Sequence, residues 1–349
     1  MQHVAIDLGG LESQICIREQ DGSLLLERRL RTTAIKRFLT DRPKSRVIVE
    51  TCAEAFRIAD GALALGHEVR VVPATLVRQL GVGYHGVKTD QRDAQALSEV
   101  SCRIDLPSVH IRSEQARTWK SLLGTRLGLI QARTQLINTV RGWLRTQTIT
   151  LRHGGTSTFP ERVRTKLLDK PEGMPTFIER QLSVVEDINR QIKEADAEIV
   201  ALVKDHPVCR RLMTVPGVGP ITAAQFHAAI DDVTRFPSAH QVESYLGLTA
   251  GERSSSQTKR RTGITKAGSA EVRRVLNEAC WCISRQRPHD PLAVWGRQVA
   301  ERRGKWAANV AMCRKLAGIL FAIWRDGTTY DASKVSRLVS GTWEPKRPA

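Results

Sequence analysis

Short apolar runs separated by polar turns mark the first hundred residues of the chain. Runs at residues 3–8, 13–18 and 23–30 have the length and alternation of β-strands, with a hairpin turn at Asp21-Gly22. The pattern continues with a helix at 33–40, a strand at 46–50, a helix at 53–65 and a strand at 67–72. Strands that alternate with helices predict an α/β domain, which we place at residues 1–105.

Two longer stretches in the middle of the chain repeat apolar residues at intervals of four and three. That spacing is typical of amphipathic helices that bury one stripe. The stripes are Leu123, Leu127, Ile130, Thr134, Ile137, Arg141 and Leu144, then Val185, Ile188, Ile192, Ala195, Ile199 and Leu202. Prolines and glycines predict a loop between them, near 151–175. Residues 106–206 are thus predicted to form a helical hairpin, either a coiled coil within one chain or a bundle between subunits.

The last part of the chain, residues 207–349, is predicted to be mostly helical. It opens with a helix-hairpin-helix-like turn, in which Gly217 and Gly219 allow backbone amides and the next helix's N-terminus to hold a phosphate oxygen. A plain helix connector is the alternative. Five of the seven tryptophans lie here, and we assign them to packing: Trp281, Trp295, Trp306, Trp324 and Trp343.

Charge narrows the class of partner. The chain of 349 residues has a formal net charge of +18, which favours a polyanion, and nucleic acid is the commonest one. Its seven cysteines contain no Cys-x-x-Cys pair, so we interpret them as reduced core residues. We recognise no signal sequence, and no apolar run that approaches the roughly 20 residues needed to span a bilayer. These features predict a cytoplasmic protein without a membrane partner.

Four carboxylates have positions that suit a metal site. Asp7 and Glu50 each close an apolar run, so both are expected at the C-terminal ends of buried strands, where open α/β sheets place ligands. Asp90 and Asp93 open an amphipathic stretch and share one helix face. Carboxylate oxygens from two strand ends and one helix suit a pair of divalent cations.

Each acid also has an ordinary structural explanation. Asp90 alternatively caps a helix, and Asp93 complements the helix dipole. Glu50 alternatively caps the loop that follows it. Asp7, which stands shortly before two glycines, also suits a phosphate loop of the actin and sugar-kinase type. The metal-site interpretation therefore depends on the four acids together.

A second candidate cluster is strongly basic. Residues 251–274 contain seven cations and two carboxylates, with small hydroxyl residues among them. We predict that the cations bind nucleic acid. They are Arg253, Lys259, Arg260, Arg261, Lys266, Arg273 and Arg274. A serine here is a nucleophile only if its proton is removed or the developing charge is stabilised. The alternative is a serine-rich loop that holds phosphates without chemistry.

Together these parts resemble one family. The acid quartet and the segments VPGVGPITAA, YLGLTAGERSSS and GITKAGSAEVRR, in this order along nearly the whole chain, are similar to DEDD-type insertion-sequence transposases. That family is related to Piv-type DNA invertases and is guided by a noncoding bridge or seeker RNA. The resemblance implies a RuvC-like N-terminal domain with the ribonuclease H fold, whose element order residues 1–105 match. It also implies a C-terminal transposase domain at 207–349.

The resemblance further implies the roles of single residues. The acids Asp7, Glu50, Asp90 and Asp93 would bind Mg²⁺, with Mn²⁺ as a substitute. A serine of the C-terminal domain would form a covalent link to DNA, and counting back from the segment at Lys266 favours Ser255. Ser254 and Ser256 remain alternatives, because an alanine at 250 and a serine at 256 replace the family's proline and glycine.

The sequence therefore predicts an RNA-guided DNA transposase or recombinase that moves its own insertion sequence. Its expected partners are donor and target DNA, a guide RNA, and further copies in a dimer or tetramer. A metal-dependent Holliday-junction resolvase-like nuclease without the serine step is the main alternative. An actin-like ATPase or sugar kinase and a non-catalytic nucleic-acid-binding protein are the others.

Overall fold

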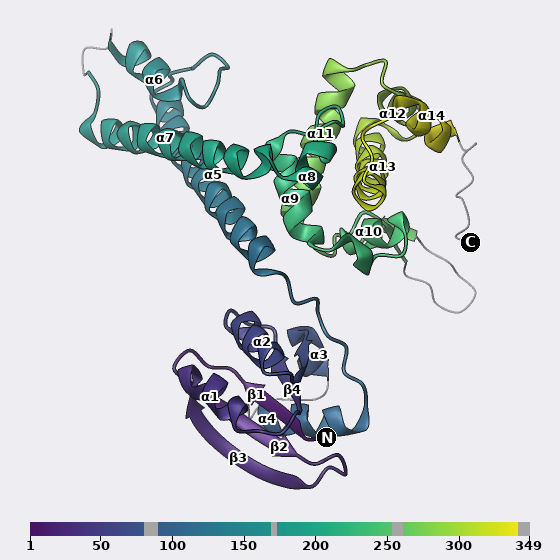
Figure 1. The fold of residues 1–349 in the computed structure, drawn as a ribbon. Helices are drawn as coiled ribbons and strands as arrows, with labels where there is room; N and C mark the ends of the chain where they lie inside the picture. The colour runs from purple at the N-terminus through teal and green to yellow at the C-terminus, as the bar shows by residue number, and fades with distance from the viewer. Residues whose placement is uncertain (80–89, 169–172, 253–260, 341–349) are drawn as a thin grey trace. The chain divides into compact units, whose positions relative to one another are not determined.

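The computed structural model describes residues 1–79, 90–168, 173–252 and 261–340 (Figure 1). The chain divides into two compact units, Met1–Arg112 and Ser113–Ala349. The first unit is mixed α/β and the second is mostly helical, as the sequence predicts. The sequence divided the same chain into three parts with the first boundary near residue 105, whereas the long helices and the C-terminal helices here form one unit.

A five-stranded sheet forms the centre of the first unit. Its strands are β1 (His3–Asp7), β2 (Glu12–Arg18), β3 (Leu24–Arg31), β4 (Arg46–Glu50) and β5 (Glu68–Val72). They lie in the order β3-β2-β1-β4-β5. The first three form an antiparallel meander, and β1, β4 and β5 are parallel. Both the elements and their order along the chain agree with the sequence prediction.

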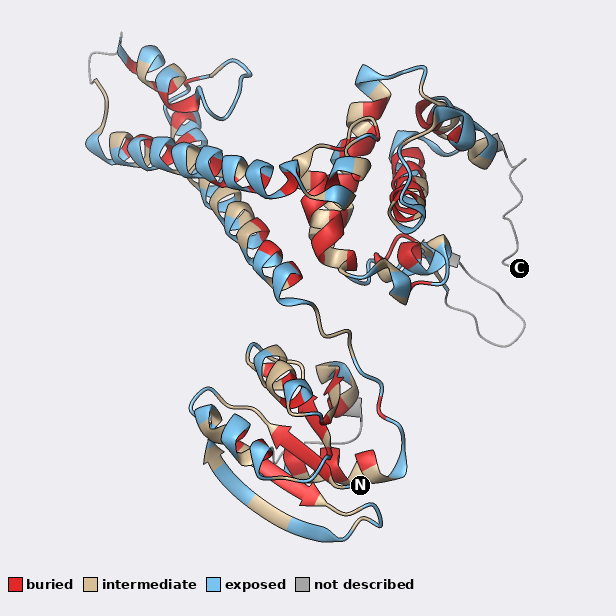
Figure 2. Ribbon diagram, in the orientation of Figure 1, coloured by how far each residue is buried: buried red, intermediate tan, exposed pale blue. Residues whose placement is uncertain are grey.

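Each face of this sheet is covered by helices. Alternate residues of β1 and β4 point to opposite faces, so one strand supplies two small cores. Val4 and Val47 pack on the side of α1 (Ile35–Thr40) and α2 (Ala55–Ala64). Ala5 and Ile48 pack on the other side, against Leu97 of α4 (Asp90–Arg103), close to α3 (Ala74–Gln79). The interior strands are accordingly buried (Figure 2).

The second unit begins with the predicted pair of long helices, α5 (Glu114–Thr146) and α7 (Thr176–Lys204). Most apolar residues of the stripes are buried near the two ends of the pair, whereas Leu127 and Ile130 in the middle of α5 are half-buried. Two predicted positions of α5 are wrong: Thr134 and Arg141 are exposed, and Val140 is buried in place of Arg141. The last predicted position of α7 is wrong: Leu202 is 40% exposed, and Val203 is buried in its place. The end of α7 packs against the C-terminal helices, and this contact buries Val203 instead of Leu202.

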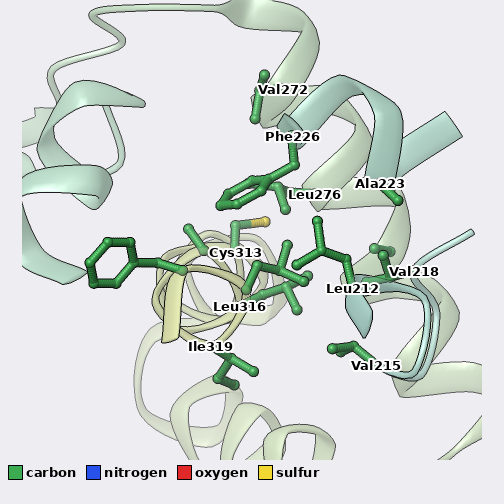
Figure 3. Packing of buried hydrophobic residues seen from close by; sticks show 14 of the residues in the cluster. Leu212, Val215, Val218, Ala223, Phe226, Val272, Leu276, Cys313, Leu316 and Ile319 are labelled. Atoms are coloured by element: carbon green, nitrogen blue, oxygen red, sulfur yellow. The ribbon is translucent and has the colours of Figure 1, made fainter. Parts of the chain in front are cut away.

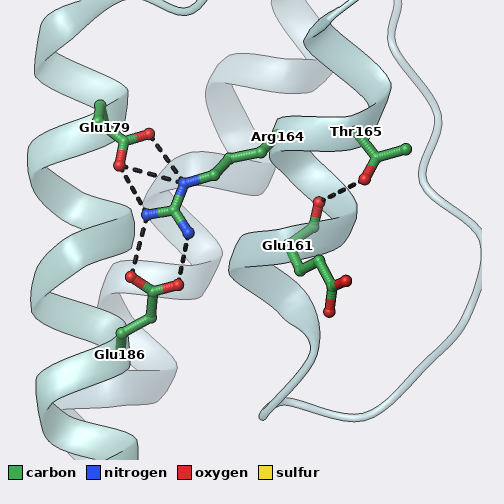
Figure 4. A network of polar contacts seen from close by, with 5 residues as sticks. All are labelled: Glu161, Arg164, Thr165, Glu179 and Glu186. Atoms are coloured by element: carbon green, nitrogen blue, oxygen red, sulfur yellow. Dashed lines mark hydrogen bonds and ion pairs between the residues drawn. The ribbon is translucent and has the colours of Figure 1, made fainter.

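The segment predicted as a loop between the long helices contains a further helix, α6 (Phe159–Leu168). Phe159, Val163 and Leu167 recur every four residues and pack with the ends of α5 and α7. Arg164 joins α6 to α7 by ion pairs with Glu179 and Glu186 (Figure 4). Its Nε donates to both carboxylate oxygens of Glu179 at 3.1 Å. Pro160, in the first turn of α6, and Pro171 and Pro175 after it favoured irregular chain, whereas the short apolar stripe favours the helix.

Shorter helices and a two-stranded sheet follow α7 in the second unit. These elements are α8 (Pro207–Leu212), α9 (Pro220–Ile230), α10 (Ala239–Tyr245), β6 (Ala250–Glu252), β7 (Arg261–Ile264), α11 (Ala270–Gln286), α12 (Pro291–Arg303), α13 (Lys305–Asp326) and α14 (Ala332–Ser340). Phe226 of α9, Leu276 of α11 and Cys313 of α13 point toward one another in the core (Figure 3). Helix α13 is buried along much of its length (Figure 2).

Helix α13 is also the one helix among the described residues that is long and apolar enough, by length and composition, to cross a membrane. The sequence pattern predicted no apolar run of that length. Leu316, Leu320 and Phe321 of this helix are buried against the surrounding helices. The apolar composition of α13 is therefore explained by its central place in a helical core.

A pair of buried histidines gives the second unit a pH dependence. His227 of α9 is stacked on Trp324 at 4.8 Å between ring centroids and lies 4.5 Å from His206. Burial, assisted by the neighbouring His206 and opposed by Asp231, lowers the pKa of His227 to about 4. In the unfolded chain the pKa returns to 6.5.

Stability should therefore be complete above pH 6.5 and fall as the pH drops toward 4, because only the unfolded chain takes up the proton in that range. The expected loss is about 3 kcal/mol. Urea unfolding at a series of pH values measures it. His227→Gln should flatten the dependence, and an equally steep profile in this variant would assign the effect to other groups.

Candidate functional site

The C-terminal ends of β1 and β4 bring two of the predicted acids together. The two strands are parallel and in register, with Ile6 opposite Val49. The next residues are Asp7 and Glu50, so these acids end neighbouring strands at one edge of the sheet. Both are half-buried. They lie two positions after Ala5 and Ile48, which places them on the α4 side of the sheet.

Helix α4 crosses this side of the sheet in the opposite direction to β1. Near the start of the strand, His3 Nδ1 lies 2.8 Å from Ser101 Oγ. Further along the strand, Ala5 packs with Leu97, one helical turn earlier. Four helical residues advance about 6 Å and two strand residues about 6.7 Å, so the two elements stay in step.

Two strand residues after Ala5 comes Asp7, and four helical residues before Leu97 comes Asp93. The same alignment therefore places Asp93 at the level of Asp7. Asp93 is 2% exposed, which agrees with a side chain that faces the sheet. Asp90 shares this helix face one turn earlier, at the helix start, and is exposed. The fold therefore brings three of the four acids to one sheet edge, with Asp90 at its rim.

The donor set at this edge fits a hard divalent cation, because all four side chains offer carboxylate oxygens. Among the described residues, however, no three His, Cys, Asp or Glu side chains form a group that could hold a metal ion. The described residues thus supply carboxylate donors at this edge of the sheet, but no group of three that encloses a metal ion.

Glu27 of β3 holds the beginning of α4 in place. Its carboxylate accepts a hydrogen bond from Gln91 Nε2 at 2.9 Å and another from Gln95 Nε2. The hydrogen bond from Gln95 lowers the pKa of Glu27 below its ordinary value, because it stabilises the carboxylate. Gln91 and Gln95 flank Asp93 in the sequence, so this contact sets the rotation of the helix face that carries the acid.

Glu27→Ala should lower metal-dependent strand cleavage about tenfold and speed hydrogen exchange at the start of α4. Glu27→Gln should restore both, because an amide can accept from one glutamine and donate to the other. Glu99→Ala is the matched control, since Glu99 also lies on α4 and, among the ion pairs of the described residues, pairs with Arg103 alone. Equal losses in the Glu27→Ala and Glu99→Ala variants would contradict this role.

The glycines of the predicted phosphate turn have different roles. Gly217 has a φ of +75°, and a Cβ there would lie 2.7 Å from the Ala279 carbonyl oxygen of α11. Close packing against α11 is therefore enough to explain this glycine, and no ligand needs to be invoked. Gly219 is the N-cap of α9, and a Cβ there would meet nothing within 4 Å. Only Gly219 has the open surroundings that a phosphate contact needs.

The basic cluster is partly described. Arg273 donates from one nitrogen to the carbonyl oxygens of Leu246 at 3.1 Å and Ala267 at 2.7 Å. Its guanidinium is thus bound to backbone, which the count of cations could not reveal. Arg274 lines an open groove of about 740 Å³ along α5. Lys266 is exposed.

The other predicted residues of this cluster lie outside the described part of the chain. They are Arg253, Ser254, Ser255, Ser256, Lys259, Arg260 and the side chain of Arg261. The flanking strands β6 and β7 pair antiparallel, with Ala250 opposite Ile264.

Two glycines overlooked in the sequence lock the base of this hairpin. Gly247 and Gly268 both have positive φ, of +68° and +71°. A Cβ on Gly247 would lie 2.1 Å from the Ala267 carbonyl oxygen, and one on Gly268 would lie 2.2 Å from that of Tyr245. The segments around residues 247 and 268 therefore cross in direct backbone contact. A glycine in each segment was the available signal.

Two family models match this chain. Residues 4–148 match the DEDD transposase family of IS110, and residues 209–293 match the family described as Transposase IS116/IS110/IS902. The first match covers the acidic sheet edge, and the second covers the helices from α8 to α11 and the basic cluster.

Curated relatives align over most of the chain. The transposase for insertion sequence element IS1111A of Coxiella burnetii is 26% identical over 94% of this chain and 90% of its own length. A probable family 20 transposase of Pseudomonas aeruginosa is 26% identical over 95% and 98%. The transposase for IS1328 of Yersinia enterocolitica is 27% identical over 94% and 98%.

The α/β unit with the acidic sheet edge and the helical unit with the basic hairpin each carry a match to a transposase family. Residues 4–148 and 209–293 are transposase domains of the IS110/IS116 family, and the chain is similar to insertion-sequence transposases over most of its length.

Proposed function

We propose that this transposase cleaves and rejoins DNA at the ends of its insertion sequence with a divalent metal bound at the acidic sheet edge. The observation that carries the proposal is the register of β1, β4 and α4, which brings Asp7, Glu50 and Asp93 to one level. The sheet order β3-β2-β1-β4-β5 supports a RuvC-like, ribonuclease H-type arrangement of this unit.

Asp7, Glu50, Asp90 and Asp93 would hold Mg²⁺, with Mn²⁺ as a substitute. A bound ion of this kind would polarise the scissile phosphate and neutralise charge that develops on its oxygens. The half-buried Asp7 and Glu50 would supply two ligands from the ends of neighbouring strands, and the buried Asp93 would add one from α4. The exposed Asp90 would be the ligand that solvent and DNA reach.

The nucleophile that we propose is Ser255, with Ser254 and Ser256 as alternatives. Its hydroxyl would lose a proton and form a phosphodiester with the DNA, and the displaced strand end would leave as a free hydroxyl. The resemblance to the family supports this step. The strands β6 and β7, which flank the serine-containing segment in the sequence, pair antiparallel.

The partners that we propose are donor and target DNA, a guide RNA and further copies of the chain. The charge of +18 suits the polyanions, and Gly219, Lys266 and Arg274 remain candidates for backbone contacts. Arg273 would contribute indirectly, by holding the loop between Leu246 and Gly268. The half-buried middle of α5 supports the long helices as an assembly surface.

One purification tests the RNA and serine steps together. RNA that copurifies with the protein is sequenced, and strand exchange is measured with Mg²⁺ in the wild type and in Ser255→Ala. The proposal predicts a defined RNA species and a protein–DNA adduct that the variant lacks. Cleavage that needs the acids but gives no adduct in any serine variant would favour a resolvase-like nuclease.

A further inference from the structure

Trp306 is the second residue of α13 and is 78% exposed. The sequence predicted that Trp306 packs in the core, and this prediction is wrong, because the side chain is largely exposed. Its described ring contact is with Trp281 of α11, edge-on, at 5.7 Å between centroids and 79° between planes. Trp295 and Trp324 are half-buried, and Trp343 lies outside the described residues. An indole this open leaves one face available to a ligand.

The corner that carries Trp306 is basic. Helix α12 ends at Arg303, and Gly304, with a φ of +81°, turns the chain directly into α13. Arg302, Arg303 and Lys305 are exposed and lie within four residues of Trp306 in the sequence, together with one exposed acid, Glu301. Among the ion pairs of the described residues, these three cations take no part. A single exposed tryptophan is ordinary on a protein surface, but one that adjoins three cations and one acid is suited to a particular ligand.

That ligand has to combine negative charge with a flat apolar face. Phosphate groups satisfy the cations, and a nucleobase satisfies the indole, because base–aromatic stacking tolerates any base. In a duplex the faces of the bases are already stacked on one another. An unpaired strand leaves them free, so the corner fits single-stranded nucleic acid and not a double helix.

We propose that Trp306, with Arg302, Arg303 and Lys305, forms a stacking site for an unpaired base of DNA. A transposase that opens duplex DNA exposes such a strand, and this site would hold it away from re-annealing. Trp281 contacts the indole at a steep angle between the ring planes, and Trp306 stays 78% exposed. The site contains none of the four acids and none of the candidate serines, so it is tested without cleavage.

Binding of an oligothymidylate of about twelve nucleotides is measured in EDTA by fluorescence anisotropy. Trp306→Ala should weaken binding about tenfold, whereas Trp306→Phe, which keeps an aromatic face, should stay within about threefold of the wild type. A blunt duplex of the same length should bind equally well to all three proteins. Trp295→Phe is the matched control at a half-buried tryptophan of the same unit.

Three results would overturn the proposal. One is wild-type affinity of Trp306→Ala for the single strand, and another is an equal loss for the duplex. The third is a change in sedimentation of Trp306→Ala without DNA, which would show that a second copy covers this surface. An oligouridylate that binds more tightly than the oligothymidylate, with the same dependence on Trp306, would replace DNA by RNA as the ligand.

Discussion

Asp93→Asn is expected to reduce metal-dependent strand cleavage by at least about a hundredfold while the protein stays folded. The amide has almost the shape of the carboxylate, so it fits the same buried position against the sheet. It lacks the negative charge that an ion at the level of Asp7 requires. The initial rate of plasmid nicking at saturating Mg²⁺ measures the effect, and circular dichroism reports the fold.

The position of Asp90 provides an internal comparison. Because Asp90 is exposed at the rim and Asp93 is buried on the sheet side, Asp90→Asn should cost less, about tenfold. The affinity for Mn²⁺, followed by electron paramagnetic resonance, should fall in the same order. Full activity of Asp93→Asn would show that α4 contributes no ligand, and the register argument would then be wrong.

Phe226→Ala should lower the free energy of unfolding of the helical unit by about 4 kcal/mol. The Phe226 ring is completely buried between α9, α11 and α13 (Figure 3), and its removal leaves a cavity that these helices cannot close. Urea unfolding followed by hydrogen exchange in α13 measures this unit separately from the sheet.

Phe177→Ala is the control for this substitution. Phe177 is 51% exposed on α7 and touches Trp143 edge-on, so its removal should cost less than about 1 kcal/mol. Similar losses at Phe226 and Phe177 would mean that the core of the second unit is not packed around α13.

The sheet and two of its acids could be predicted because local pattern determines them. Asp7 and Glu50 follow apolar runs, and a strand that ends after such a run exposes its last side chain at the sheet edge. The pairing of Asp93 with that edge is different. It depends on the direction in which α4 crosses β1, and contacts such as that between His3 and Ser101 join residues nearly a hundred positions apart.

Other differences between sequence and structure also come from long-range packing. The helical period allowed Leu202 or Val203 as the last buried position of α7, and contact with the C-terminal core selects Val203. Composition suggested that Arg273 binds nucleic acid, whereas backbone carbonyls already occupy its guanidinium. Tryptophan is usually buried. Trp306 is exposed because it lies in the first turn of α13, directly after the corner at Gly304.

The central claim is that acids at the sheet edge support metal-dependent DNA cleavage. The most direct measurement follows cleavage of a supercoiled plasmid that carries the ends of the element, using the full chain with its copurified nucleic acid. We predict cleavage with Mg²⁺, none in EDTA, and none for Asp7→Asn with Mg²⁺. Cleavage in EDTA, or cleavage by Asp7→Asn at the wild-type rate, would contradict the claim.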